Sequence, residues 1–200
     1  MIARYDCRHF LGFKPCPFRR ECKDCPHFSP FGTRILIVKL AAMGDVLRTT
    51  PLLHGLRRAY APCHITWLTD PSVVSMLQGI QEIDRLLPYT CETVLGLENE
   101  SFDRLFCFDK EPKATALAMK IRAEHKIGFG MSPFGNVMPL NRESEYAFEL
   151  GINDPLKFRA NTRTYPELLF ECAGLPYPEP QEYIFPNFSA VIAEAAEYPQ

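Results

Sequence analysis

Short apolar runs alternate with helix-like segments along most of the chain after residue 33. The run ILIVKL (35–40) is almost continuously apolar and rich in β-branched residues, which is typical of a strand buried on both faces. Residues 46–60 then carry apolar side chains at helical spacing. Asp45 is placed to cap this helix, and Pro51 inside it predicts a kink or an irregular first turn.

The same alternation repeats further along the chain. It predicts strands at 64–69, 83–89, 102–109 and 125–130, and helices at 71–79, 91–98 and 111–123. Strands and helices at this spacing indicate β-α-β units, so the predicted fold is α/β with a Rossmann-like, doubly wound parallel sheet. After Gly130 a turn-rich stretch precedes two short helices, at 143–151 and 164–175.

The first 33 residues have no sustained helical or strand period and are dense in Cys, Pro and basic residues. Four of the eight cysteines lie here with the spacing C-x8-C-x5-C-x2-C. A C-x2-C turn brings two thiolates to one metal ion, and metal binding would stabilise a segment too small for an apolar core. The predicted ligands of a structural zinc ion are Cys7, Cys16, Cys22 and Cys25.

Other interpretations of this cysteine segment stay open. An iron–sulfur cluster also suits four cysteines, and His9 or His27 could replace one of them. The four could also be unliganded thiols. The remaining cysteines, at 63, 91, 107 and 172, are expected to be ordinary buried thiols.

Composition narrows the class of protein. With 46% hydrophobic and 23% charged residues, the chain can bury enough surface to fold. No apolar run approaches the roughly 20 residues of a membrane span, and no apolar leader follows Met1, so a cytoplasmic, reducing location is expected. Residues 1–34 hold seven Lys/Arg against three Asp/Glu; this basic start indicates either an anionic partner or scattered solvated charge.

The loop after the first strand holds the candidate chemistry. Ligands of doubly wound sheets bind at the carboxyl ends of the strands, where Gly44 and Asp45 lie. Neither G-x-G-x-x-G nor a P-loop motif occurs in the chain, which disfavours the usual dinucleotide and nucleoside-triphosphate sites. From the residues alone, Asp45 is either a helix cap or a general base for a substrate hydroxyl.

Two stretches carry a family resemblance. ILIVKLAAMGDVLRTTPLLHGLRRAYAPCHITWLTD and FDRLFCFDKEPKATALAMKIRAEHKIGFG resemble glycosyltransferase family 9, the bacterial ADP-heptose:lipopolysaccharide heptosyltransferases. The likeness covers about residues 34–174 and is most specific from Lys39 to Pro51. It implies an inverting transfer of a heptose-type sugar from ADP-heptose to a lipopolysaccharide-core acceptor, and a two-domain GT-B architecture.

The resemblance also implies roles for single residues. Asp45 would be the base that deprotonates the acceptor hydroxyl, and Gly44 would let the acceptor approach the backbone. Arg48 would contact an anionic, lipid A–Kdo type acceptor. Lys39 and Asp109 lie at predicted strand ends and would bind substrate. The alternative is that Lys39 belongs to an ion pair and that Asp109 is a carboxylate at the start of a helix.

The domain organisation follows from these elements. We expect a cysteine-rich metal-binding module at 1–33, an acceptor-side Rossmann-like domain at 34–185, and a linker at 186–200 towards a donor-binding domain. The chain is then an incomplete N-terminal half, inactive alone, that meets a nucleotide sugar through the second domain. Peripheral contact with the inner face of the inner membrane is expected, and nucleic acid is not. The alternative is a metal-stabilised Rossmann-like binding module that contacts nucleic acid or protein without catalysis.

Overall fold

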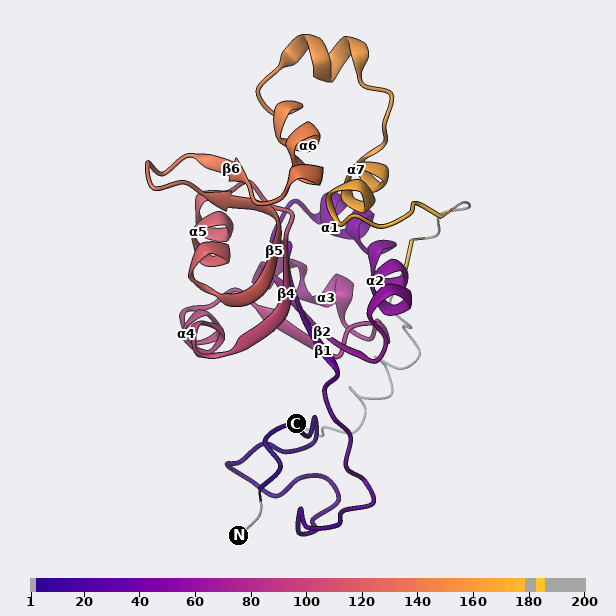
Figure 1. Cartoon of the computed structure of the whole chain (residues 1–200), viewed down its shortest axis with the longest axis vertical. Helices are drawn as coiled ribbons and strands as arrows, with labels where there is room; N and C mark the ends of the chain where they lie inside the picture. Colours follow the sequence, from indigo (N-terminus) through magenta and orange to yellow (C-terminus); the bar gives the residue numbers. More distant parts are fainter. Residues whose placement is uncertain (1–2, 179–182, 186–200) are drawn as a thin grey trace.

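A six-stranded sheet forms the centre of the computed structural model, which describes residues 3–178 and 183–185 (Figure 1). The linker predicted at 186–200 lies outside the described residues. The strand order is β3-β2-β1-β4-β5-β6, with every neighbouring pair parallel except the antiparallel pair β5 and β6. The strands are β1 (Thr33–Val38), β2 (Cys63–Thr69), β3 (Arg85–Pro88), β4 (Ser101–Cys107), β5 (Arg122–Met131) and β6 (Val137–Pro139).

Helices cover both faces of this sheet, as the alternating pattern predicts. The α-helices are α1 (Met43–Thr49), α2 (Leu52–Tyr60), α3 (Val74–Leu77), α4 (Cys91–Asn99), α5 (Pro112–Lys120), α6 (Glu145–Glu149) and α7 (Tyr165–Cys172). Shorter turns are η1 (Pro71–Val73), η2 (Arg142–Ser144) and the π-helical η3 (Leu156–Ala160). The predicted doubly wound arrangement is therefore confirmed.

Successive residues of β1 supply two separate hydrophobic cores. Ile35 and Ile37 pack with α1, α2, α3 and α7 on one face, whereas Leu36 and Val38 pack with α4 and α5 on the other. All four are fully buried, and burying each side chain contributes about 1.5–3 kcal/mol. This two-faced burial is why the run around 35–40 is continuously apolar instead of alternating.

Pro51 interrupts the first helical segment, as predicted. The helix ends at Thr49 and a second one begins at Leu52, because proline lacks the N–H that a continuous helix needs. The predicted capping role of Asp45 is wrong: Ala42 occupies the N-cap, and Asp45 lies in the first turn of α1.

The turn-rich stretch after Gly130 contains a strand that the pattern does not predict. Residues of β6 pair antiparallel with the end of β5, from Phe129–Pro139 to Met131–Val137. At three residues this strand is too short for its alternation to be recognised, and hairpin pairing instead of local preference creates it. The π-helical turn η3 is likewise not predicted.

Gly128 allows β5 to pair closely with β4. Its φ is +95°, and a Cβ built there would lie 2.0 Å from the carbonyl oxygen of Cys107. Only glycine avoids both the positive φ and this overlap.

The cysteine segment, residues 3–30 of the described chain, lies beyond the amino ends of the strands, opposite α6 and η3 (Figure 1). Arg8 forms an ion pair at 3.6 Å with Asp84, which precedes β3. Within the segment, an isolated antiparallel β-bridge pairs the backbones of Cys7 and Pro30. Within the described residues, no helix is long and apolar enough to cross a membrane.

Candidate functional site

The candidate site lies where the chain leaves two adjacent parallel strands in opposite directions. After β1 the chain enters α1, whose Val46 joins one core; after β4 it enters α5, whose Ala114 joins the other. This is the topological switch point of the sheet, where the loops diverge and leave space for a ligand.

Lys39 and Asp109 form a buried ion pair below this opening. Lys39 Nζ lies 2.6 Å from Asp109 Oδ1, and the two residues are 2% and 5% exposed. Asp109 Oδ2 also accepts a hydrogen bond from the Leu40 amide, and Lys39 Nζ donates to the carbonyl of Ala41. The pair therefore connects the loop after β1 to the end of β4. Of the two roles predicted for these residues, substrate binding or an ion pair, the structure shows the ion pair.

Asp45 stands on α1 directly above that loop and is partly open to solvent. Its side chain is 34% exposed, and Oδ1 accepts a hydrogen bond from Nη2 of Arg48, whose side chain is 47% exposed. The backbone carbonyl of Asp45 accepts a bond from Thr49 Oγ1 at 2.7 Å, within the same helix. A carboxylate so placed can both accept a proton and be approached from outside.

Gly44 precedes Asp45 on the exposed side of α1. A Cβ added at Gly44 would meet no atom of another element within 4 Å, so nothing packs over this position of α1. The structure thus brings Gly44, Asp45 and Arg48 to the surface of the switch point and places Lys39 and Asp109 beneath them.

Tyr165 completes this arrangement from α7, more than a hundred residues along the chain. Its ring lies under the guanidinium of Arg48, with Cζ 4.6 Å from the ring centroid. Burial, reinforced by the negative charge of Asp45, raises the pKa of the Tyr165 hydroxyl above its usual value. The pattern T-x-x-E at 164–167 predicts the helix start, but no sequence signal connects Tyr165 with Arg48.

The four cysteines of the N-terminal segment border one small cavity together with His9 and His27. Its volume is about 20 Å³, enough for about one water-sized molecule or ion. However, among residues 3–178 and 183–185 no group of three or more Cys, His, Asp or Glu side chains is arranged to hold a metal ion. The predicted zinc site and its iron–sulfur alternative are therefore not supported by this arrangement.

Aromatic contacts join separate parts of the cysteine segment. The ring of Phe18 stacks on His27 at 3.9 Å, and the guanidinium of Arg4 lies 3.7 Å above the ring of Phe28. The backbone amide of Phe18, and then those of Arg20 and Arg19, lower the pKa of the Cys16 thiol. Backbone amides, and not basic side chains, thus account for the lowered pKa of the Cys16 thiol.

Three of the other four cysteines are buried as expected, but Cys91 is exposed at the first turn of α4. Desolvation raises the pKa of the Cys107 thiol to about 12 and that of Cys172 to about 11. These buried thiols are structural parts of the core.

Comparison with known proteins decides which kind of protein this arrangement resembles. No family model matches the chain. It is 28% identical over 165 residues to the lipopolysaccharide core heptosyltransferase OpsX of Haemophilus influenzae. The chain is similar to heptosyltransferases. The resemblance predicted from the two sequence stretches is thereby confirmed.

One solved structure agrees with this chain in fold. The glycosyl transferase family 9 structure from Veillonella parvula aligns with 84% of this chain at a TM-score of 0.54 and 19% identity. The heptosyltransferase WaaC of E. coli, solved with ADP, aligns with 74% at a TM-score of 0.49. The chain has the fold of the matched part of the Veillonella structure.

These matches cover only part of each relative. The alignment with OpsX takes in 78% of this chain but 45% of OpsX, and that with the Veillonella structure takes in 51% of that chain. The chain therefore spans about half the length of the proteins that it matches.

Proposed function

We propose that this chain is the acceptor-binding half of a heptosyltransferase that uses a nucleotide-sugar donor such as ADP-heptose and a lipopolysaccharide-core acceptor. The observation that carries the proposal is the partly exposed carboxylate of Asp45, held over the switch point in a chain similar to OpsX. The geometry suits a general base, because Arg48 holds one oxygen of the carboxylate while the side chain stays 34% exposed to solvent.

The proposed reaction is a single displacement with inversion. Asp45 takes the proton of an acceptor hydroxyl while that oxygen forms a bond to the anomeric carbon of the donor sugar. The bond from this carbon to the nucleotide diphosphate breaks, and the diphosphate leaves with the electron pair. One carboxylate suffices, since no covalent sugar–enzyme intermediate forms.

The surrounding residues support this step in different ways. Arg48 keeps Asp45 oriented, and its remaining N–H groups suit a phosphate or carboxylate of the acceptor. Gly44 leaves room for the acceptor beside α1. The pair of Lys39 and Asp109 fixes the loop that carries α1 and has no need to touch the substrate.

The donor is proposed to bind outside this chain, in a second domain that completes a GT-B architecture. We therefore expect no heptose transfer by the 200-residue chain alone. Transfer from ADP-heptose to a lipopolysaccharide-core acceptor is expected when the chain is joined to the other half of OpsX. Heptose transfer by the isolated chain would overturn the division of roles between the two halves. If neither the isolated chain nor the joined protein binds the acceptor, the assignment of acceptor binding to this chain is overturned.

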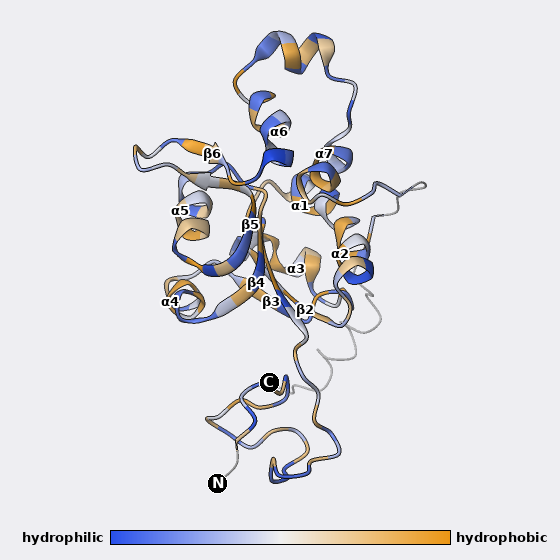
Figure 2. Cartoon of the chain, in the orientation of Figure 1, coloured by the Kyte–Doolittle hydropathy of each residue, from blue (hydrophilic) through white to orange (hydrophobic). Residues whose placement is uncertain are grey.

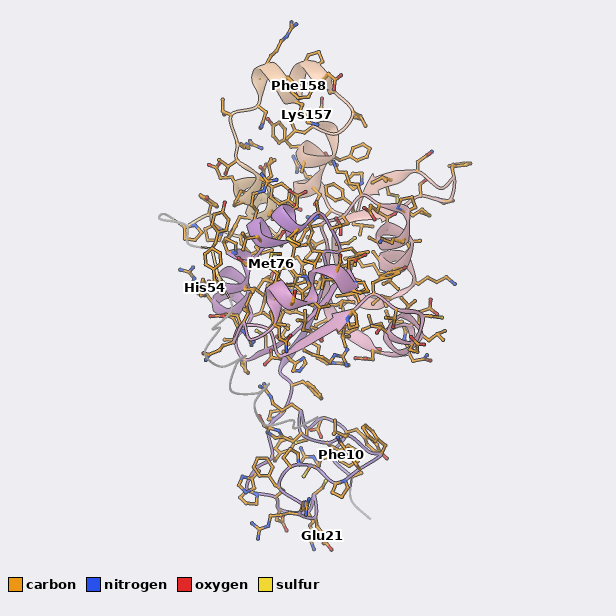
Figure 3. The ribbon with its side chains drawn as sticks, turned by 180° about the vertical axis from the view of Figure 1, so that it is seen from behind. Phe10, Glu21, His54, Met76, Lys157 and Phe158 are labelled. Carbon is orange, nitrogen blue, oxygen red and sulfur yellow. The ribbon has the colours of Figure 1, made fainter. Side chains whose placement is uncertain are left out.

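We also propose that residues 151–163 contact the surface of the membrane that carries the acceptor. Ile152 and Phe158 are each 72% exposed, and Phe158 lies at the end of the molecule opposite the cysteine segment (Figure 3). Lys157 and Arg159 flank Phe158, and neither forms an ion pair with a described residue. Hydrophobic and hydrophilic residues lie side by side in this turn (Figure 2), which suits insertion among anionic headgroups.

Vesicle sedimentation tests this contact. The chain is expected to bind phosphatidylglycerol-containing vesicles, and Phe158→Ser is expected to lose that binding. Leu95→Ser is the control, because Leu95 is also exposed, at 57%, but lies on α4. Equal binding by both variants, or none by the wild type, would contradict the proposal.

For the cysteine segment we propose a structural zinc ion on Cys7, Cys16, Cys22 and Cys25. Support comes from the single cavity that these thiols share and from the preference of zinc for thiolates. Binding would have to draw the thiols closer together. Elemental analysis is expected to find about one zinc per chain, lost in a Cys22→Ser, Cys25→Ser double variant and kept in Cys91→Ser. A metal content near zero would end the proposal.

A further inference from the structure

Tyr165 of α7 contacts the candidate site through Arg48, whose guanidinium lies over its ring. The start of α7 is rigidly defined: Thr164 Oγ1 accepts from the Glu167 amide, and the Glu167 carboxylate accepts from the Thr164 amide at 2.5 Å. Pro166 and Leu169 are buried on the inner side of the helix. The Tyr165 ring is therefore held in place by a capped helix.

Close packing against α2 fixes α7 as a whole. A Cβ built on Gly55 of α2 would lie 2.9 Å from the Phe170 ring, so only glycine permits this approach. Phe170 is 1% exposed and also packs edge-on against Tyr177 at 5.4 Å. The platform that carries Tyr165 is thus anchored in the main core and does not depend on the exposed side of α1.

Three observations connect Tyr165 with Asp45. The guanidinium of Arg48 lies over the Tyr165 ring and at the same time donates to Asp45 Oδ1. The Tyr165 oxygen is buried and has no hydrogen-bond partner of normal geometry among the described residues. Burial and the negative charges of Asp45 and Asp109 raise its pKa, whereas the Thr49 side chain and the charge of Arg48 lower it.

We propose that Tyr165 is a positioning residue: its ring supports Arg48, which in turn holds the Asp45 carboxylate at the acceptor side of the site. Without this support Arg48 is a long, half-exposed side chain with many rotamers, and an exposed ion pair alone holds it only weakly. The aromatic ring beneath the guanidinium adds a second contact that restricts these rotamers. This inference rests on the function proposed above, in which Asp45 is the base.

Arginine Nε–Hε spectra of the 200-residue chain test the contact without any activity. The ring current of Tyr165 is expected to shift the Arg48 signal, which is assigned by its loss in Arg48→Lys. Tyr165→Phe should keep the shift and Tyr165→Leu should remove it. Tyr146→Leu is the matched control, because Arg163 lies 4.1 Å above the Tyr146 ring; it should move only the Arg163 signal.

Steady-state transfer by the chain joined to the OpsX donor half tests the consequence. Tyr165→Leu is expected to lower kcat by about 10- to 100-fold with little change in the acceptor KM, since misplacing a reacting group costs rate more than binding. Tyr165→Phe should restore kcat. If Tyr165→Leu unfolds the chain, Tyr165→Met removes the ring but keeps a long apolar side chain, and it should lower kcat similarly.

The outcomes separate this inference from the proposed function. Normal kcat in Tyr165→Leu, with transfer abolished in Asp45→Asn, would overturn the positioning role alone. An equal loss in Tyr165→Phe would overturn it too, because the hydroxyl and not the ring would then matter. Unchanged transfer in Asp45→Asn would overturn the proposed function itself.

Discussion

Lys39 Nζ and Asp109 Oδ1 lie 2.6 Å apart beneath the loop that leads into α1, and both side chains are almost completely buried. Lys39 follows β1 and Asp109 follows β4, so one ion pair connects the ends of two adjacent strands. Their pairing joins the two loops that form the switch point.

Asp109→Asn is expected to destabilise the chain strongly. The substitution leaves the Lys39 charge buried without a counter-charge, which costs about 3–5 kcal/mol. Urea denaturation followed by circular dichroism measures the loss. Glu171→Gln breaks the exposed pair with Arg163, also 2.6 Å long, and should cost less than about 1 kcal/mol; similar costs for both variants would show that burial of the pair contributes nothing.

Gly128→Ala and Gly96→Ala are expected to act in opposite directions. Alanine at Gly128 meets the Cys107 carbonyl and an unfavourable φ, so the melting temperature should fall. At Gly96, inside α4, a Cβ meets no atom within 4 Å, and alanine should stabilise the helix by about 0.5–1 kcal/mol. Calorimetry of the two variants checks both signs, and tolerance of alanine at Gly128 would contradict the close pairing of β4 and β5.

Thiol labelling should distinguish the cysteines outside the N-terminal segment. Cys91 is exposed, whereas Cys107 is buried with its pKa raised to about 12. Because the thiolate is the reactive form, iodoacetamide at neutral pH should modify Cys91 and leave Cys107 unmodified until the chain is denatured. Mass spectrometry of tryptic peptides reads out both sites; rapid labelling of native Cys107 would be inconsistent with this core.

Acid should weaken the fold through His64. Burial lowers the pKa of His64 below its usual value of about 6.5, and its ring packs edge-on against Phe31 at 4.8 Å. As the pH falls below about 6.5, the unfolded chain takes up the proton before the folded one, so stability declines. His64→Gln should flatten this decline between about pH 7 and pH 5, while His54→Gln, at an exposed position, should not.

The sequence pattern predicts the sheet well because each buried strand has to be apolar on both faces. It also predicts the helix break at Pro51, which depends on the chemistry of one residue. It misses β6, which exists through hairpin pairing, and the N-cap at Ala42, which has no capping side chain. The local pattern cannot show such long-range effects.

The residues of the candidate site also differ in whether the local sequence predicts them. Gly44, Asp45 and Arg48 are found from a local motif because they lie within one turn of helix. Tyr165 is not, because its contact with Arg48 depends on how α7 packs on α1 and α2. The spacing of the four cysteines predicts zinc ligands, whereas among the described residues the thiols border one cavity without the arrangement of a metal site.

The most direct measurement is the rate of heptose transfer to a lipopolysaccharide-core acceptor by the chain joined to a donor half, with Asp45 intact and with Asp45→Asn. Loss of a general base lowers kcat by about 100- to 10,000-fold. We predict a loss of that size, with acceptor binding and melting temperature unchanged and with full activity in the control Glu124→Gln, at an exposed position at the amino end of β5. Transfer by Asp45→Asn at the wild-type rate would contradict the account.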